Sequence, residues 1–422
     1  AAPPVAIPRS QHSFHTRPSS DLDNGDDSGS AYLFDTTPGR QIAKLLPDDG
    51  AVEDWFGRSV AISGDTAIVG AWYDDDNGDF SGSAYLFDTT TGDQIAKLLP
   101  NDSAVGDEFG FSVSISGATA IVGARLDDDN GSFSGSAYLF DTTTGRQIAK
   151  LLANDGAELD VFGSSVAISG TTAIVGAFFG DDNGDKSGSA YLFDTTTGRQ
   201  IAKLLPYGGA AGDWFGDSVA ISGETAIVGA PGDDDNGTGS GSAYLFDISD
   251  PANPMQLCQL LCKLLPDDGA VGDIFGGSVA ISGATAIVAA AYDDDNGSFS
   301  GSAYLFDTTS GEQIAKLLPE DGATDDLFGW SVAISGTTAL AGALVDDDNG
   351  DFSGSAYLFD AAAAPGMCPW DLNGNSDVGI LDLLALLAAW GTDPGGPPDF
   401  DGDGNVGIID LLTLLANWGE CP

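Results

Sequence analysis

Short apolar segments alternate with polar turns along most of the chain. In one representative stretch, residues 59–62, 66–71, 83–87 and 94–99 are rich in Val, Ile, Tyr, Phe and Ala, and the breaks between them are rich in Gly, Asp, Ser and Thr. This pattern is typical of β-strands joined by turns. The close spacing leaves no room for crossover helices and predicts four antiparallel strands in each unit.

The four-strand unit recurs along the chain. Phe-Gly pairs are spaced by 53 residues, with one interval of 60 that contains an insertion around 250–262; they fall at 56–57, 109–110, 162–163, 215–216, 275–276 and 328–329. A second marker, Gly-Ser-Ala-Tyr-Leu-Phe-Asp, occurs seven times between 29–35 and 354–360. One four-stranded antiparallel sheet in every ~50 residues predicts an all-β fold, a β-propeller.

The predicted number of blades depends on which marker is counted. The seven Tyr-Leu-Phe strands favour seven blades, the count that we prefer, in a propeller at 21–360 preceded by an N-terminal tail or degenerate half-blade at 1–20. The six Phe-Gly strands give six blades, with residues 41–46 completing the last sheet and the first Tyr-Leu-Phe strand left over. A left-over strand can pair with the open edge of a neighbouring molecule, so this alternative implies self-association.

Three elements of the unit carry a family resemblance. Phe56-Gly57, the Ala-Ile-Val-Gly-Ala segment at 67–71 and the Gly-Ser-Ala-Tyr-Leu-Phe segment at 82–87 resemble the FG-GAP repeat of integrin α-subunit propellers and bacterial surface proteins. The resemblance covers roughly residues 21–362. The calcium loop of integrin propellers lies between the first two strands of a blade, where this chain has only a short turn at 63–65, so calcium binding there is not implied.

The fourth strand of each unit carries a lysine, at the expected outer edge of its blade: Lys44, Lys97, Lys150, Lys203, Lys263 and Lys316. A charge on an exposed strand edge discourages pairing with other sheets, and this is the interpretation that we favour. A role in ligand binding is the alternative.

Composition excludes several classes of function. The chain has 64 acidic and 14 basic residues and a formal net charge of −50. We expect no nucleic-acid partner and no binding to anionic membranes, because both need basic patches. The longest apolar run, 383–390, is too short for membrane insertion as a helix. Both histidines, His12 and His15, precede the repeats, which excludes a histidine-based catalytic dyad within them.

Most acidic residues lie in two loops of each unit. The loops after the second and fourth strands of a propeller sheet emerge on the same face, so we expect one strongly acidic face that needs cations. The loop at 74–79 has the oxygen ligands and glycine turn that Ca²⁺ prefers, and Asp74, Asp76 and Asp79 are its predicted ligands. A solvated turn, copied when the unit was duplicated, is an equally good interpretation.

A different domain follows the repeats. After a linker at 361–367, residues 368–422 contain two related segments with oxygen-bearing side chains at positions 1, 3, 5, 7 and 12, each followed by an apolar run. This spacing is typical of EF-hand-like calcium sites and predicts Ca²⁺ as a cofactor. The predicted ligands are Asp371, Asn373, Asn375, Asp377 and Asp382 in the first segment, and Asp399, Asp401, Asp403, Asn405 and Asp410 in the second.

Two features of these segments resemble the dockerin module: aspartate at position 12, and one helix after each loop. The resemblance implies a small α-helical, calcium-dependent domain that binds a cohesin-like protein. Loop positions 10 and 11, which carry recognition in cellulosomal dockerins, are apolar here (Ile380-Leu381 and Ile408-Ile409) and indicate a more apolar partner surface.

The four cysteines add information about the compartment. Cys368 and Cys421 bracket the C-terminal domain, and we expect them to form a disulfide, which requires an oxidising compartment. Cys258 and Cys262 lie too far apart on a strand to pair, so a turn between them and two buried thiols are equally compatible with the sequence.

These observations favour a secreted or cell-surface, calcium-dependent binding or scaffold protein, with a propeller displayed through a dockerin-like anchor. The propeller would present its surface to a protein or glycan ligand. We do not expect an enzyme, because near-identical blades supply no carboxyl group in an environment unlike its neighbours. The alternatives are a carbohydrate-active enzyme carried by a dockerin and a self-assembling surface or matrix protein.

Overall fold

The computed structural model describes residues 11–12, 24–36, 39–256, 263–348, 350, 352–361, 377–378, 380–391, 406–416 and 419–420. The chain divides into two compact units, Ala1–Leu358 and Phe359–Pro422. Among the described residues, no helix has both the length and the apolar character needed to cross a membrane.

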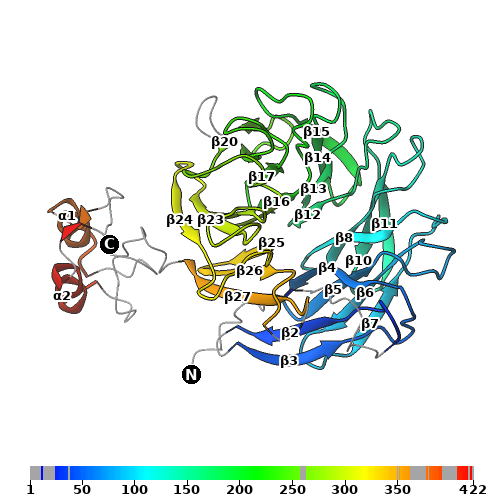
Figure 1. Ribbon diagram of the computed structural model, residues 1–422, viewed down its shortest axis with the longest axis horizontal. Coiled ribbons are helices and arrows are strands. Elements are labelled where there is room, and N and C mark those ends of the chain that lie inside the picture. The colour runs from blue at the N-terminus through cyan, green and yellow to red at the C-terminus, as the bar shows by residue number, and fades with distance from the viewer. Residues whose placement is uncertain are drawn as a thin grey trace. The chain divides into compact units, whose positions relative to one another are not determined.

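The first unit is a propeller of small antiparallel sheets arranged in a ring (Figure 1). Six of its sheets follow the Phe-Gly pairs in chain order, and we number these blades 1 to 6. Blades 1 to 3 have four strands each: β4 (Phe56–Ser63), β5 (Thr66–Ala71), β6 (Ser83–Asp88) and β7 (Gln94–Leu98); β8 (Phe109–Ser116), β9 (Thr119–Ala124), β10 (Ser136–Asp141) and β11 (Arg146–Leu151); β12 (Val166–Ser169), β13 (Thr172–Ala177), β14 (Ser189–Asp194) and β15 (Arg199–Leu204).

The other three blades vary this plan. In blade 4 the insertion splits the outer strand, so that β18 pairs with both β19 and β20. Blade 6 has three described strands. The bounds are β16 (Val219–Ser222), β17 (Thr225–Ala230), β18 (Ser242–Asp247), β19 (Met255–Gln256) and β20 (Lys263–Leu264); β21 (Ser278–Ser282), β22 (Thr285–Ala290), β23 (Ser302–Asp307) and β24 (Gln313–Leu317); β25 (Phe328–Ser335), β26 (Thr338–Ala343) and β27 (Ser355–Asp360).

A further three-stranded sheet precedes blade 1. It contains β1 (Gln11–His12), β2 (Ala31–Asp35) and β3 (Arg40–Leu45), and its Ala31, Leu33 and Leu45 pack into the core of blade 1. This sheet has no Phe-Gly strand among the described residues. The propeller therefore has six blades, and the preferred prediction of seven is wrong. The six-blade alternative is wrong in one detail: β3 pairs with β2 and does not complete the last sheet.

In blades 1 to 5 the third strand has a strand on either side, and this position explains the repeated Tyr-Leu-Phe sequence. In blade 2, Tyr138 pairs with Val122 on one side and with Lys150 on the other. Leu139 and Tyr138 point to opposite faces of the sheet and both have no exposed surface. Apolar side chains on both faces are expected here, because each sheet is covered by a neighbouring blade on either side.

The Phe-Gly pair joins consecutive blades. Phe109, at the start of blade 2, forms an isolated parallel bridge with Gly82 of blade 1, and the same bridge occurs at all six junctions that the structure describes. Gly82 has a φ of +79°, and a Cβ atom there would lie 2.0 Å from the Phe109 carbonyl oxygen, so no other residue fits. The Phe109 ring packs edge-on against Tyr138 at 5.5 Å.

The second unit has two described helices, α1 (Ile380–Ala388) and α2 (Ile408–Ala416), and a two-stranded ladder of β28 (Asp377–Val378) and β29 (Gly419–Glu420). Leu386, Val406 and Leu414 form its small core. Asp410, the third residue of α2, reaches back and accepts a hydrogen bond from the Gly407 N–H at 2.7 Å, which satisfies a backbone donor at the start of the helix as in a capping box.

Candidate functional site: carboxylate–lysine clusters and a central cavity

The lysine of the fourth strand lies among carboxylates from two acidic loops. In blade 1, the Lys97 Nζ contacts Asp49 at 2.9 Å, Asp74 at 3.0 Å and Asp76 at 2.5 Å. Tyr85 donates its phenolic hydrogen to Asp74 (2.7 Å) from the neighbouring strand, and the ammonium lies 5.0 Å from the centre of the Tyr85 ring. The two loops therefore meet on one face, as their order along the chain predicts.

The cluster stabilises charges that burial alone would disfavour. Burial lowers the pKa of Lys97, but hydrogen bonds to Asp76, Asp49 and Asp74 outweigh it and raise the pKa above its usual range. Burial likewise raises the pKa of Asp49, and the bond to Lys97 outweighs it and lowers the pKa below its usual range. Asp74 is only 3% exposed, so the ammonium compensates a carboxylate that has lost most of its water.

The same cluster recurs around the ring. Lys150 contacts Asp102, Asp127 and Asp129 at 2.7–2.9 Å, and Lys316 contacts Asp268, Asp293 and Asp295. Two blades are simplified by substitution: Gly180 replaces the buried aspartate in blade 3, and Gly208 replaces the outer one in blade 4. Lys203 and Lys263 accordingly contact two carboxylates each.

Blade 6 has the carboxylates of the cluster, and no lysine-bearing fourth strand is among its described strands. Asp321, Asp346 and Asp348 occupy the positions of Asp268, Asp293 and Asp295 in blade 5. Tyr357 donates a hydrogen bond to Asp346 at 2.8 Å, as the equivalent tyrosines of blades 1, 2, 4 and 5 do to their aspartates. The charges of Asp346 and Asp321, together with burial, raise the pKa of Asp348 above its usual range, the opposite of the shift at Asp268 beside Lys316.

The predicted calcium ligands are only partly described. Asp74 and Asp76 come together around Lys97, whereas Asp79 contributes its backbone carbonyl to a hydrogen bond from Gly106. In the described part of the chain, no group of three or more His, Cys, Asp or Glu residues has an arrangement that could hold a metal ion. Asp371, Asn373, Asn375, Asp399, Asp401, Asp403 and Asn405, the side chains of Asp377 and Asp382, and all four cysteines lie outside the described residues.

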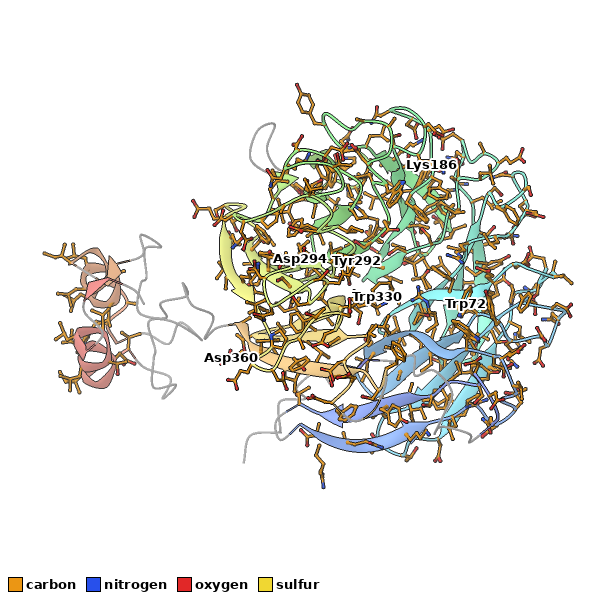
Figure 2. All side chains as sticks on the ribbon, in the orientation of Figure 1. Trp72, Lys186, Tyr292, Asp294, Trp330 and Asp360 are labelled. Atoms are coloured by element: carbon orange, nitrogen blue, oxygen red, sulfur yellow. The ribbon has the colours of Figure 1, made fainter. Side chains whose placement is uncertain are left out.

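A second candidate site is the cavity in the middle of the ring, which sequence reasoning missed. It has a volume of about 730 Å³ and is lined by residues at or just before the first strand of all six blades, and by residues at or just after some of the second strands, such as Arg125 and Tyr292. Figure 2 shows Trp330 and Tyr292, two of the lining residues, near the middle of the ring. Side chains from different blades therefore converge on one space.

The lining residues break the symmetry of the repeats. The position directly after the Phe-Gly pair faces the cavity in every blade, and it holds six different residues: Arg58, Phe111, Ser164, Asp217, Gly277 and Trp330. The signal was present in the sequence, as the position that differs among units that are otherwise nearly identical. It is visible only when the repeats are compared with one another rather than read for motifs.

Two arginines stack on one phenylalanine at the cavity wall. The guanidinium carbon of Arg125 lies 3.7 Å from the centre of the Phe111 ring, and that of Arg58 lies 4.8 Å from it. Glu108 accepts a hydrogen bond from the Arg125 Nε at 2.6 Å. In the described part of the chain no carboxylate lies within 4.0 Å of the Arg58 guanidinium, which is solvent-exposed within the cavity.

The cavity also contains a carboxyl group in an unusual environment. Burial raises the pKa of Asp217 to about 6, and the charge of Arg58 opposes this shift only in part. Among the described lining residues, Asp217 is the one carboxylic acid. The residues at the equivalent position of the other five blades are of other types, so this carboxyl group has no equivalent around the ring.

Comparison with known proteins identifies the repeats. The FG-GAP repeat model matches residues 40–87, 93–140, 146–193, 199–246, 260–306 and 312–359, which together are more than half of the chain. The chain belongs to the FG-GAP repeat family. Each match begins on the outer strand of one sheet and ends on the Tyr-Leu-Phe strand of the next, so the sequence repeat is offset from the blade.

The other comparisons add little. No curated protein matches the chain. Among solved structures, the crystal structure of the computationally designed Ika8 protein is 14% identical over 79% of each chain, with a TM-score of 0.47, a similarity too low to carry an argument. FG-GAP repeats often bind Ca²⁺.

Proposed function

We propose that this FG-GAP protein is a secreted or cell-surface binding protein that holds its ligand in the central cavity. The observation that carries the proposal is a contrast in repetition: five blades keep a lysine among two or three carboxylates, while the cavity position differs in all six. A single asymmetric site on a symmetric scaffold suits recognition of one ligand.

The chemistry of the cavity favours an acidic oligosaccharide. Arg58 offers a guanidinium whose donors match a carboxylate, and Trp330 and Tyr292 offer aromatic surface for sugar rings. Trp330 is 42% exposed, so its ring is accessible to a ligand. The ligand class that meets both requirements is a glycan containing uronic acid.

Titration calorimetry with oligogalacturonides, and with neutral cello-oligosaccharides for comparison, tests this proposal. We expect binding of the acidic sugars only, weakened at least tenfold by Arg58→Ser, which installs the residue that blade 3 has at this position. Lys186→Ser, on an exposed loop, is the matched loss of positive charge and should bind like the wild type. Equal binding of neutral sugars, or no binding of acidic ones, would contradict the proposal.

An enzyme acting on the same sugars is the second candidate, and Asp217 is the observation that favours it. A glycosidase of the usual kind needs two carboxyl groups beside the scissile bond. The described lining residues supply one, which favours binding over hydrolysis. Turnover of oligogalacturonides that disappears in Asp217→Asn would establish the enzyme instead.

The anchoring part of the proposal concerns the C-terminal unit. We propose that residues 368–422 are a dockerin-like module that binds Ca²⁺ and attaches the protein to a cohesin-like partner. The capped helix α2 and the packing of Leu386 against Leu414 are compatible with two helices that follow two metal loops. Calcium titration of the full chain should show sites that are lost in Asp399→Asn and kept in Asp74→Asn; the reverse result would place calcium on the propeller.

A further inference from the structure

Within the described residues, blade 6 has no counterpart of the outer strand that closes blades 1 to 5. Among the described strands, none continues its sheet beyond β27. In blades 1, 2, 3 and 5 a complete fourth strand occupies this position, and in blade 4 β19 and β20 share it. The missing strand is the one that carries the cluster lysine.

The uncovered part of β27 is apolar. Leu358 is 40% exposed, whereas its counterparts in blades 1 to 5 have no exposed surface: Leu86, Leu139, Leu192, Leu245 and Leu305. Ala356 is likewise exposed, and its counterparts are buried. Those counterparts pack against the Phe-Gly strand of the following blade, as Leu86 does against Phe109, so the exposure marks a face of β27 that no such strand covers among the described residues. The edge of the same strand, beside the three carboxylates, also has no described neighbour and can accept one more strand.

The charge of the surface specifies what that strand must carry. In blade 5 the equivalent carboxylates Asp268, Asp293 and Asp295 surround the ammonium of Lys316. In blade 6 Tyr357 is in place and donates to Asp346 at 2.8 Å, but no described cation lies among the three carboxylates. In this chain an ammonium ion therefore occupies the complete three-carboxylate site in blades 1, 2 and 5, and a site of two carboxylates in blades 3 and 4.

We propose that blade 6 binds an extended, lysine-bearing segment of a partner polypeptide as its fourth antiparallel strand. The register follows from blade 5, where Lys316 pairs with Tyr304, Ala315 with Leu305 and Leu317 with Ala303. In blade 6 the incoming lysine lies opposite Tyr357, a small residue opposite Leu358 and a leucine opposite Ala356. Backbone pairing supplies affinity and the lysine supplies specificity.

A metal ion is the weaker interpretation of the same carboxylates. The described residues contain no group of three or more His, Cys, Asp or Glu arranged to hold a metal ion. The hydroxyl of Tyr357 also uses Asp346 as an acceptor, which suits a hydrogen-bonded ammonium better than a metal ligand. This inference does not depend on the ligand of the central cavity.

A synthetic peptide with the sequence of residues 313–318, Gln-Ile-Ala-Lys-Leu-Leu, is the probe. Its binding to the full chain is measured by fluorescence anisotropy, beside a peptide with norleucine in place of lysine. We expect the lysine peptide to bind and the norleucine peptide to bind at least tenfold more weakly. Equal binding of the two peptides, or none, overturns the proposal.

Matched protein variants locate the site. Asp348→Asn and Leu358→Asp should each weaken peptide binding at least fivefold, whereas Asp295→Asn, the same position as Asp348 in the closed blade 5, should leave it unchanged. Equal weakening by Asp295→Asn overturns the proposal. So does Ca²⁺ binding that Asp348→Asn abolishes and peptide does not displace.

Sedimentation of the protein alone distinguishes the source of the strand. A monomer at all concentrations supports a separate partner. A dimer or larger assembly that Asp348→Asn dissolves would mean that a second copy of the chain supplies the strand, and a separate partner would then be overturned.

Discussion

The rim and the centre of the propeller follow opposite rules. At the rim, the lysine, tyrosine and aspartates of one blade recur in the next with nearly the same distances. At the centre, Arg58, Asp217 and Trp330 occupy one register position and share no chemistry. Residues that recur in every blade serve the stability of the fold, whereas residues that differ between blades serve a site that occurs once in the molecule.

Blade 6 combines repeated residues, as at the rim, with a local environment that occurs once, as at the centre. It keeps the carboxylates and the tyrosine of the lysine clusters, but its described strands include no lysine strand, so these groups have an environment of their own. A difference between repeats thus arises either by substitution at one position, as in the cavity, or by loss of a strand. Both create a site without altering the other blades.

Removing a cluster lysine should have the largest effect on stability. Lys150→Met leaves Asp127, which is 3% exposed, without its ammonium, and an unpaired buried charge costs about 3–5 kcal/mol. Denaturant unfolding followed by tryptophan fluorescence measures the loss. Lys186→Met should stay within ~0.5 kcal/mol of the wild type, because that lysine lies on an exposed loop. Equal effects of the two changes would show that the rim clusters are ordinary surface charges.

Asp217 should make stability depend on pH near neutrality. Its pKa is raised to about 6, so its contribution to stability is present below the usual value near 3.8 and is lost as pH rises through 6. Asp217→Asn should therefore gain stability relative to the wild type between pH 4 and 8, by at most ~2 kcal/mol. Arg58→Met should move this dependence to higher pH, because Arg58 lowers the pKa of Asp217. A difference that does not vary with pH would mean that the carboxyl is normally solvated.

An aspartate-to-asparagine substitution at the equivalent position should lower the free energy of unfolding in blade 5 and raise it in blade 6. Asp295→Asn removes an ion pair with Lys316 and should lower the free energy of unfolding by up to ~1 kcal/mol. Asp348→Asn removes a carboxylate whose pKa is raised by Asp346 and Asp321, so the unfolding midpoint at pH 7 should rise slightly. On acidification, protonation of Asp348 should stabilise the wild type, whereas protonation of Asp268, whose pKa is lowered by Lys316, should destabilise it. Loss of stability in both variants would mean that a cation already occupies blade 6.

The propeller was predictable because its signals are local and repeated. Strand lengths, Gly-Asp turns and the Phe-Gly interval predict the blades, and the order of the strands predicts that the two acidic loops meet on one face. The role of the lysines was not predictable in this way. Lys97 looks like an edge charge in the sequence, and only the fold shows that Asp49, 48 residues away, and Asp74 lie beside it.

The cavity was missed for a physical reason. Arg58 and Asp217 are 159 positions apart and become neighbours only because six first strands line one space. A motif search finds residues at short, fixed spacings, and this site has none. The sheet at the start of the ring was mispredicted because residues 1–20 carry no alternating pattern of apolar and polar residues. The strands expected there were placed only from the repeat interval of the later units.

Changes at the centre should affect stability least and binding most. Trp330 is 42% exposed, and Trp330→Ser removes little packing, so the free energy of unfolding should change by less than ~1 kcal/mol. The matched change on the same strand, Phe328→Ser, removes a ring with no exposed surface that packs edge-on against Tyr357 at 5.6 Å. That change should cost at least ~3 kcal/mol. If Trp330→Ser destabilises the protein as much as Phe328→Ser does, the cavity residues are part of the core, and their variation among blades reflects packing rather than recognition.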